Sequence, residues 1–477
     1  MEYTDRGKWE ALAVLGVAYL MVVLDISIVN VALPSIETDL KFTPDNLQWV
    51  VSAYSLTFGG FLLLGGRAGD LLGRRRVFMA GLGLFALSSL VCGLSQSDTM
   101  LILARGVQGA AAAILSPSVF SIVMVTFKEG AERNKALGIL GGIAGAGGAI
   151  GVLAGGVLTE YAGWQWIFFV NVPIGLAALA LVPRLVKESR LEGAQRHFDA
   201  LGAVVITSAL LMLVYAITQA NDAGWGSLQT VGLMTLSIIL IGAFAVIENR
   251  SPAPLVPLGF FRKRTPTGAN IVGFGLGSAI FGMFLLQSLY MQQVLHFSAL
   301  KTGVCYLAVA LTAVVASGIS QALVTKLGVR VVLAIGLSVL TAGLLYFTQI
   351  SVHGSYWADL FPGFILVGIG LGFSFVPVSI AALAGVEPHL AGLASGLINT
   401  SQQIGGALGV AILVTVANSR ITDLVAGGTD PLTAQTEGYA RAFFVGAGLA
   451  AVSLAATFVF LRSEELEAAE AAQATAH

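Results

Sequence analysis

The sequence predicts an all-α polytopic membrane protein, and three observations support this fold class. Hydrophobic residues make up 56% of the 477 residues and charged residues only 11%, so there are too few charges to cover a water-soluble protein of this length. The apolar residues occur in runs of about 20, which is the length that a helix needs to cross a bilayer. The basic residues are concentrated in alternate segments between these runs, as expected when alternate loops face the cytoplasm.

Fourteen runs are long and apolar enough to be candidate spans. They lie near residues 10–32, 47–64, 77–94, 100–127, 136–159, 166–182, 200–220, 228–247, 268–291, 302–324, 329–350, 360–384, 391–417 and 439–461. If the N-terminus is inside, 20 of the 25 Lys and Arg residues lie in inner segments, and only Arg105 lies within a span. We therefore expect a multi-pass protein of the cell membrane with both termini in the cytoplasm.

A weak internal repeat predicts how the spans are grouped. When Gly73 is aligned with Gly328, residues 66–77 face residues 321–332, and both segments follow the second span of a six-span group. Duplicated six-helix halves around a site at the membrane midplane are a transporter architecture. We therefore predict a first six-helix bundle at residues 1–183, a linker with inserted transmembrane helices 7 and 8 at 184–265, a second six-helix bundle at 266–462, and a cytoplasmic tail at 463–477.

Two charged residues at membrane depth are the main candidates for function. Asp25 lies inside the apolar run 11–32, where an ionisable side chain costs roughly 2.5 to 3.5 kcal/mol on insertion scales and is retained for pairing, titration or ligand binding. Arg105 cannot easily lose its proton and therefore needs an anionic or carbonyl partner. Gln108 lies one turn further on the same helix face. A purely structural role for Arg105, bound to backbone carbonyls, is the alternative interpretation.

Four motifs together resemble the major facilitator superfamily and, within it, the fourteen-helix drug:proton antiporter branch of the EmrB/QacA type. They are the segments 24–34 (LDISIVNVALP), 66–76 (GRAGDLLGRRR), 105–109 (RGVQG) and 164–175 (WQWIFFVNVPIG). The resemblance implies the major facilitator fold, with two six-helix bundles plus an inserted helix pair. It also implies that Asp25 is the proton-coupling acid and that Arg105 is its neighbour.

The same resemblance assigns roles to two further groups of residues. The loop after the second helix would act as a latch that closes the cytoplasmic side, through Gly66, Asp70, Gly73 and Arg74. The glycine-rich fifth span resembles the antiporter motif of the family, with Gly147, Gly151, Gly155 and Gly156. Val152 stands where that motif usually has proline, and close packing of small residues is an equally good reading of these glycines.

A substrate cavity is expected between the two halves. Aromatic, methionine and amide side chains can accommodate varied apolar or cationic ligands, although each such residue also suits ordinary packing. The candidate lining residues are Met21, Tyr54, Gln108, Met283, Phe284, Gln287, Tyr290, Asn399 and Gln403.

The expected function is proton-coupled export of hydrophobic or cationic small molecules by alternating access, without enzymatic chemistry. The five histidines show no metal-ligand spacing and the sequence has no P-loop, so we expect no metal, nucleotide or other cofactor, and an ion gradient as the energy source. The expected partners are a small-molecule substrate, protons and lipid, with no nucleic acid and a monomeric state. An exporter dedicated to one endogenous metabolite, lipid or siderophore is the main alternative. A non-transporting membrane receptor is a third, less favoured because the sequence has no sizeable soluble domain.

Overall fold

The protein is helical throughout the described residues, which in this computed structural model are 5–127, 131–189, 199–252, 254–256, 258–386 and 391–461. Twelve helical segments among them are long and apolar enough to cross a membrane, and the described residues contain no strand. The prediction of an all-helical membrane protein is confirmed. In two further helices, α3 and α6, the described apolar stretches are shorter, at 49–62 and 150–161.

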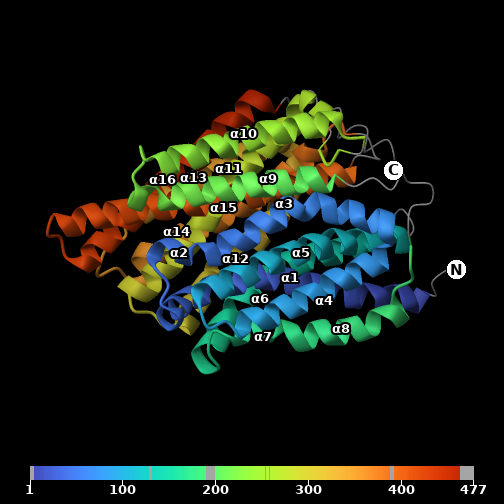
Figure 1. The fold of residues 1–477 in the computed structure, drawn as a ribbon, viewed down its shortest axis with the longest axis horizontal. Helices are drawn as coiled ribbons and strands as arrows, with labels where there is room; N and C mark the ends of the chain where they lie inside the picture. Colours follow the sequence, from blue (N-terminus) through green and yellow to red (C-terminus); the bar gives the residue numbers. More distant parts are fainter. Residues whose placement is uncertain are drawn as a thin grey trace.

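The long helices run side by side along the longest axis of the molecule (Figure 1). Their bounds are α1 (Asp5–Leu40), α2 (Pro44–Leu47), α3 (Trp49–Leu72), α4 (Arg74–Gly93), α5 (Asp98–Thr126), α6 (Ala131–Tyr161), α7 (Trp166–Phe169), α8 (Asn171–Leu185), α9 (Ala200–Ala223), α10 (Leu228–Arg250), α11 (Arg264–Leu289), α12 (Ala299–Leu327), α13 (Val329–Tyr346), α14 (Phe361–Leu383), α15 (Ala391–Ala426) and α16 (Pro431–Phe460). Several helices are longer than the predicted spans, because a helix can continue past the apolar core into the polar interface.

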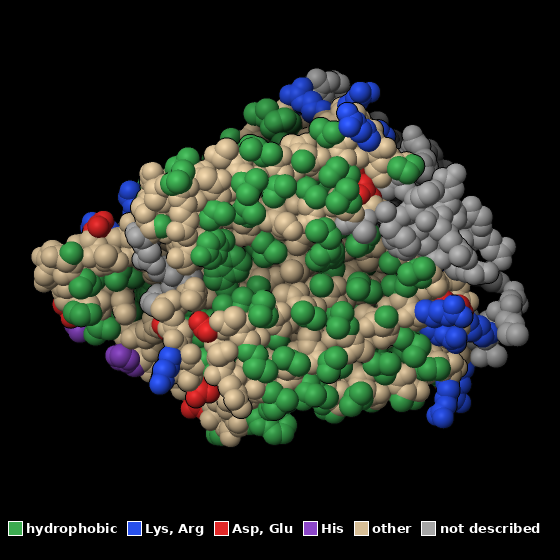
Figure 2. Space-filling model, viewed as in Figure 1, with side chains coloured by type: hydrophobic (Ala, Val, Ile, Leu, Met, Phe, Trp, Pro, Cys, Tyr) green, Lys and Arg blue, Asp and Glu red, His purple; other side chains and the backbone are tan. Residues whose placement is uncertain are grey.

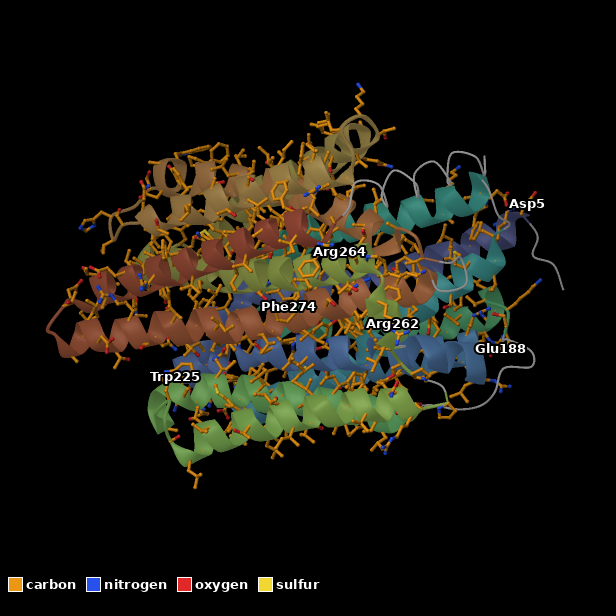
Figure 3. The ribbon with its side chains drawn as sticks, turned by 90° about the horizontal axis from the view of Figure 1, so that it is seen from above. Asp5, Glu188, Trp225, Arg262, Arg264 and Phe274 are labelled. Atoms are coloured by element: carbon orange, nitrogen blue, oxygen red, sulfur yellow. The ribbon has the colours of Figure 1, made fainter. Side chains whose placement is uncertain are left out.

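The two ends of the molecule differ from its middle in surface chemistry. Asp5 and Glu188 mark one end, and Trp225 marks the other (Figure 3); we call them the Asp5 end and the Trp225 end. On the face shown in Figure 2, hydrophobic side chains cover the middle while Lys, Arg, Asp and Glu gather toward the ends. This distribution is the one that a bilayer requires, with an apolar band between two polar caps.

Small residues set the closest helix contacts. On α6, Gly151 and Gly155 face Ser27 and Ile28 of α1, so that a Cβ at either position would overlap α1. Gly156 faces the backbone of Ala299 at the start of α12 instead. Without a hydrophobic driving force between helices in lipid, such close approach is a main source of helix association. Gly147, one turn before Gly151, also faces α1. The glycines of the fifth predicted span therefore allow α6 to pack closely against α1 and α12.

The predicted inserted pair, α9 and α10, packs against the rest of the protein mainly through α9. Leu210 and Val214 of α9 share an apolar cluster with Leu56 of α3 and with Ala407 and Ala411 of α15. The pair thus lies beside the line where α3 meets α15, and α10 packs on the outer side of α9.

Candidate functional site

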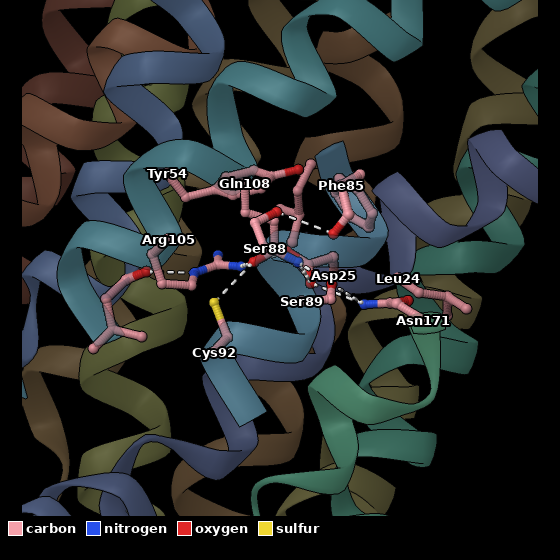
Figure 4. A network of polar contacts seen from close by, with 12 residues as sticks. Leu24, Asp25, Tyr54, Phe85, Ser88, Ser89, Cys92, Arg105, Gln108 and Asn171 are labelled. Carbon is pink, nitrogen blue, oxygen red and sulfur yellow. Dashed lines mark hydrogen bonds and ion pairs between the residues drawn. The ribbon is translucent and has the colours of Figure 1, made fainter. Parts of the chain in front are cut away.

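The centre of the site is the carboxylate of Asp25 on α1, which faces the guanidinium of Arg105 on α5 (Figure 4). Arg105 Nη1 donates a hydrogen bond to Asp25 Oδ2. Asp25 is 0% exposed and Arg105 is 1% exposed. A fully buried ion pair is stable only when its remaining donors and acceptors are also satisfied, so the surrounding polar groups determine what this pair can do.

The second carboxylate oxygen of Asp25 is bound by two amides. Gln108 Nε2 donates to Oδ1 at 2.7 Å and Asn171 Nδ2 donates to the same oxygen at 3.2 Å. Both amides also donate to Ser89 Oγ, at 2.6 and 3.2 Å. An ionised carboxylate only accepts hydrogen bonds, and all of these partners donate. The network is therefore arranged around the deprotonated form of Asp25.

Arg105 has partners besides Asp25. Its Nε donates to the Val50 carbonyl oxygen at 2.9 Å, and its Nη1 also donates to Gln108 Oε1 at 2.8 Å. Its Cζ lies 4.2 Å from the centre of the Tyr54 ring, within cation–π distance. If Asp25 took up a proton, the guanidinium would still have a carbonyl, an amide oxygen and an aromatic face as partners. Protonation of Asp25 would thus remove the ion pair without leaving the Arg105 guanidinium without partners.

The helices that carry this network all precede residue 186. Asp25 comes from α1, Tyr54 and Val50 from α3, Arg105 and Gln108 from α5, with further groups from α4 and α8. Arg105 and Gln108 share one face because they are three residues apart on a helix. The described network is therefore built from helices α1, α3, α4, α5 and α8.

Part of this network was not predicted as site residues from the sequence. Ser89 and Cys92 lie one turn apart on α4, and Cys92 Sγ donates to Gln108 Oε1 at 3.5 Å. Asn171 was included in a motif, but its contact with Asp25 was not predicted. The available signal was weak: Ser88, Ser89 and Asn171 are small polar residues in or near apolar runs, and such residues are common in membrane helices.

The loop between α3 and α4 is organised by Gly73 and Glu188. Gly73 has φ 108°, a left-handed conformation that suits glycine. Glu188 Oε1 accepts from the Arg75 backbone N–H at 3.1 Å, and Glu188 Oε2 lies 3.6 Å from Arg76 Nε. Arg74 N–H donates to the Ser189 carbonyl oxygen at 2.9 Å. Glu188 had not been predicted as part of this loop.

The remaining latch residues give less information. Gly66 lies beside Pro117 of α5. The side chain of Asp70 lies outside the described residues, as do residues 387–390 before α15. The latch role of Gly66, Asp70, Gly73 and Arg74 therefore stays a prediction.

The predicted cavity residues fall into two groups. Tyr54 and Gln108 belong to the Asp25 network, and Met21 is buried in the same bundle. In the later helices, Met283, Gln287, Tyr290 and Gln403 are buried, Phe284 is partly buried, and Asn399 is exposed. Both polar atoms of the Gln287 amide and Nε2 of Gln403 are buried without a hydrogen-bond partner. Such groups are rare in native proteins and often mark places where water or a ligand binds.

The fold and the buried charge pair together define a multi-pass membrane protein with an ionisable centre. The profile of the Major Facilitator Superfamily matches residues 15–410, and the chain belongs to this superfamily. This result confirms the superfamily that the four motifs predicted.

Several curated relatives are similar over most of their length. The chain is 38% identical to "Puromycin resistance protein pur8" of Streptomyces alboniger, over 99% of this chain and 95% of that protein. It is 37% identical to "Cephamycin export protein CmcT" of Amycolatopsis lactamdurans, over 86% and 85% of the two chains. Among solved structures, a bacterial homologue of the human lysosomal transporter Spinster has a TM-score of 0.72 at 15% identity, with 97% of this chain and 98% of that chain covered. At that identity the likeness concerns the fold alone.

Proposed function

We propose that this protein is a proton-coupled exporter of hydrophobic or cationic small molecules, a drug:proton antiporter. The observation that carries the proposal is the fully buried Asp25 carboxylate, paired with Arg105 inside a membrane-spanning helix. The relatives named for drug resistance and export support the substrate class. A transporter dedicated to one compound is the second candidate, because two of these relatives are named for single antibiotics.

The proposed mechanism follows from the partners of the two charged groups. When deprotonated, Asp25 accepts from Arg105, Gln108 and Asn171 and fixes α1 against α5 and α8. Proton uptake would remove the charge that attracts Arg105, while the Val50 carbonyl and the Tyr54 ring keep the guanidinium satisfied. The proton thus changes how α1 is bound within its bundle. A change of this kind can bias the equilibrium between inward-open and outward-open states.

We further propose fourteen membrane-spanning helices, as in the EmrB/QacA branch, with the Asp5 end in the cytoplasm. The helix lengths of α3 and α6, 24 and 31 residues, support adding them to the twelve described segments. Arg75 and Arg76 contact Glu188, which marks the Asp5 end. Arg262 also lies on the side of the molecule toward that end (Figure 3), as a cytoplasmic side requires. We also propose that the protein is located in the plasma membrane and that it is a monomer.

Two matched glycines test the orientation. Gly226 and Gly259 are exposed, and a Cβ at either position would have no neighbour within 4 Å. We expect Gly226→Cys to react with an impermeant thiol reagent added to intact cells, and Gly259→Cys to react only after lysis. The unmodified chain is the control, because Cys92 and Cys305 are both buried. The reverse labelling pattern would contradict the proposed orientation.

Transport by purified protein in vesicles tests the function itself. A substrate is first chosen from a panel of cationic dyes and antibiotics by the resistance that overexpression confers. An imposed proton gradient should then drive its uphill movement by the unmodified protein. Asp25→Asn should abolish this movement, and Asp39→Asn should not, because Asp39 lies near the end of the same helix and contacts Trp164 and Gln165 instead. Uphill movement by Asp25→Asn would overturn the proposal.

A further inference from the structure

A second carboxylate lines a cavity far from Asp25, at the Trp225 end of the molecule. The cavity has a volume of about 230 Å³ and lies between helices of both halves. Its wall includes Glu37 of α1 and Leu47 of α2 on one side, and residues of α11, α15 and α16 on the other. No residue of the Asp25 network lines it. The cavity is therefore a separate feature of the fold.

A chain of polar contacts crosses from one half to the other at this cavity. Gln293 Nε2 donates to Glu37 Oε2 at 2.6 Å, and the Tyr439 hydroxyl donates to Gln293 Oε1 at 2.9 Å. Gln293 belongs to a π-helical turn, Tyr290–Val294, that continues α11. In the same turn, Gln292 Nε2 donates to the Val31 carbonyl oxygen of α1 at 2.9 Å. Two consecutive glutamines thus contact α1, and π-turns of this kind are frequent at functional sites.

Among the described residues that line this cavity, no basic side chain balances the Glu37 carboxylate. Among the described lining residues, Glu37 is the only acid, and none is Lys, Arg or His. No described basic side chain forms an ion pair with Glu37, which accepts a hydrogen bond from the neutral amide of Gln293. A carboxylate that shares a small cavity with neutral groups attracts a cation, because the cavity replaces part of the water that would otherwise screen the charge.

The other lining groups indicate which kind of cation would fit. Tyr439 is only 4% exposed and supplies both an aromatic ring and a hydroxyl. Leu285, Leu286 and Leu289 form an apolar wall, and buried Oε1 of Gln435 has no hydrogen-bond partner. An inorganic ion prefers a shell of oxygens, whereas an alkylammonium group suits an acid, an aromatic ring and apolar side chains. The volume is below the range of about 300 to 1,000 Å³ typical of sites for whole drug-sized ligands.

We propose that Glu37, Gln293, Tyr439 and Gln435 form a second binding site, which takes a small organic cation or the alkylammonium group of a larger molecule. This site rests on the proposed function for one point: at the outer end of an exporter, it would receive a cationic substrate on its way out of the protein. The inter-half contact between Gln293 and Glu37 would then be replaced by a contact between substrate and Glu37. Binding itself does not depend on transport.

Equilibrium binding of tetraethylammonium to the purified full chain, without any ion gradient, tests this site. The measurements use Asp25→Asn as the background, so that loss of the central carboxylate cannot be confused with loss of the second site. In that background, Glu37→Gln should weaken binding by about tenfold or more, because it removes the charge. Its amide oxygen can still accept from Gln293, so the inter-half contact is retained. Glu37→Asp should restore most of the affinity.

Two controls separate the charge of Glu37 from general effects. Asp423→Asn removes an exposed carboxylate at the same end, next to the lining residue Thr422 but not itself in the cavity wall, and should leave binding unchanged. Tyr439→Leu should weaken binding about threefold through loss of the ring. Binding that is unaffected by Glu37→Gln, or that is matched by Na⁺ at equal concentration, would overturn the proposal. Failure of proton-driven transport with normal Glu37-dependent binding would count against the proposed function only.

Discussion

At the Asp5 end, the turn between α3 and α4 and the turn between α12 and α13 have closely similar geometry. Each turns at a glycine in the left-handed region, Gly73 with φ 108° and Gly328 with φ 78°. Two residues later, each has an arginine that donates to carbonyl oxygens near the end of the last helix of its own half. Arg75 Nη1 binds the Val186 carbonyl at 3.3 Å, and Arg330 Nη2 binds the Phe458 carbonyl at 2.9 Å.

Buried charge distinguishes helices α1–α8 from helices α11–α16 among the described residues. The first half contains the buried pair of Asp25 and Arg105, whereas among the described residues 258–386 and 391–461 no charged side chain is buried. The corresponding polar groups there are amides and hydroxyls such as Gln287 and Gln403. Helices α1–α8 and helices α11–α16 thus share a similar turn at the Asp5 end, while among the described residues of these two groups the buried ion pair belongs to α1–α8 alone.

Removing an arginine from each half gives the largest expected difference. Arg105→Met leaves the Asp25 carboxylate buried without its counter-ion, and we expect a loss of about 3 to 5 kcal/mol in the free energy of unfolding. Arg330→Met removes one hydrogen bond to a carbonyl and a cation–π contact with Phe458 near the surface, which we expect to cost about 1 kcal/mol. Unfolding of the purified proteins in mixed detergent micelles measures both values.

A second arm of the same experiment isolates the charge. Adding Asp25→Asn to Arg105→Met should recover part of the lost stability, because the unpaired carboxylate is then gone. Equal destabilisation by Arg105→Met and Arg330→Met would show that the two halves are less different than the structure indicates.

The two loop glycines provide a smaller contrast. Gly73→Ala should destabilise the protein by about 1 to 3 kcal/mol, since alanine is strained at this φ and its Cβ would lie 2.7 Å from Glu188 Oε1. Gly328→Ala has backbone strain of the same kind, but no atom lies within 4 Å of its added Cβ, so we expect about 1 kcal/mol. Thermal unfolding of both variants, with Glu188→Ala added to Gly73→Ala, measures the steric part. If Glu188→Ala gives no recovery, the contact at Gly73 is not the cause.

The helical fold could be predicted from the sequence because apolar runs of membrane length predict helices directly. Asp25 and Arg105 were each singled out as charged residues at membrane depth, but their proximity was expected only from the resemblance to the family. The bonds from Asn171 and Ser89, and the contacts of Glu188 with the α3–α4 loop, join segments far apart in the chain. Such contacts depend on how the helices pack, which no local pattern specifies.

The substrate roles of Gln108 and Tyr54 stay predictions. In the structure both side chains contact Arg105. The cavity at Glu37 was not predicted, because its wall combines α1 and α2 with α11, α15 and α16. The substrate roles of Gln287 and Gln403 stay predictions.

The central claim is that one buried carboxylate, present in only one half, couples protons to substrate. Its most direct test is proton movement in vesicles driven by a substrate gradient, followed with a pH-sensitive dye in the lumen, together with exchange of labelled substrate at equal concentrations. We expect the unmodified protein and Asp39→Asn to move protons and to exchange substrate. Asp25→Asn should exchange a neutral substrate but move no protons. Substrate-driven proton movement by Asp25→Asn would contradict the account and place the coupling acid elsewhere.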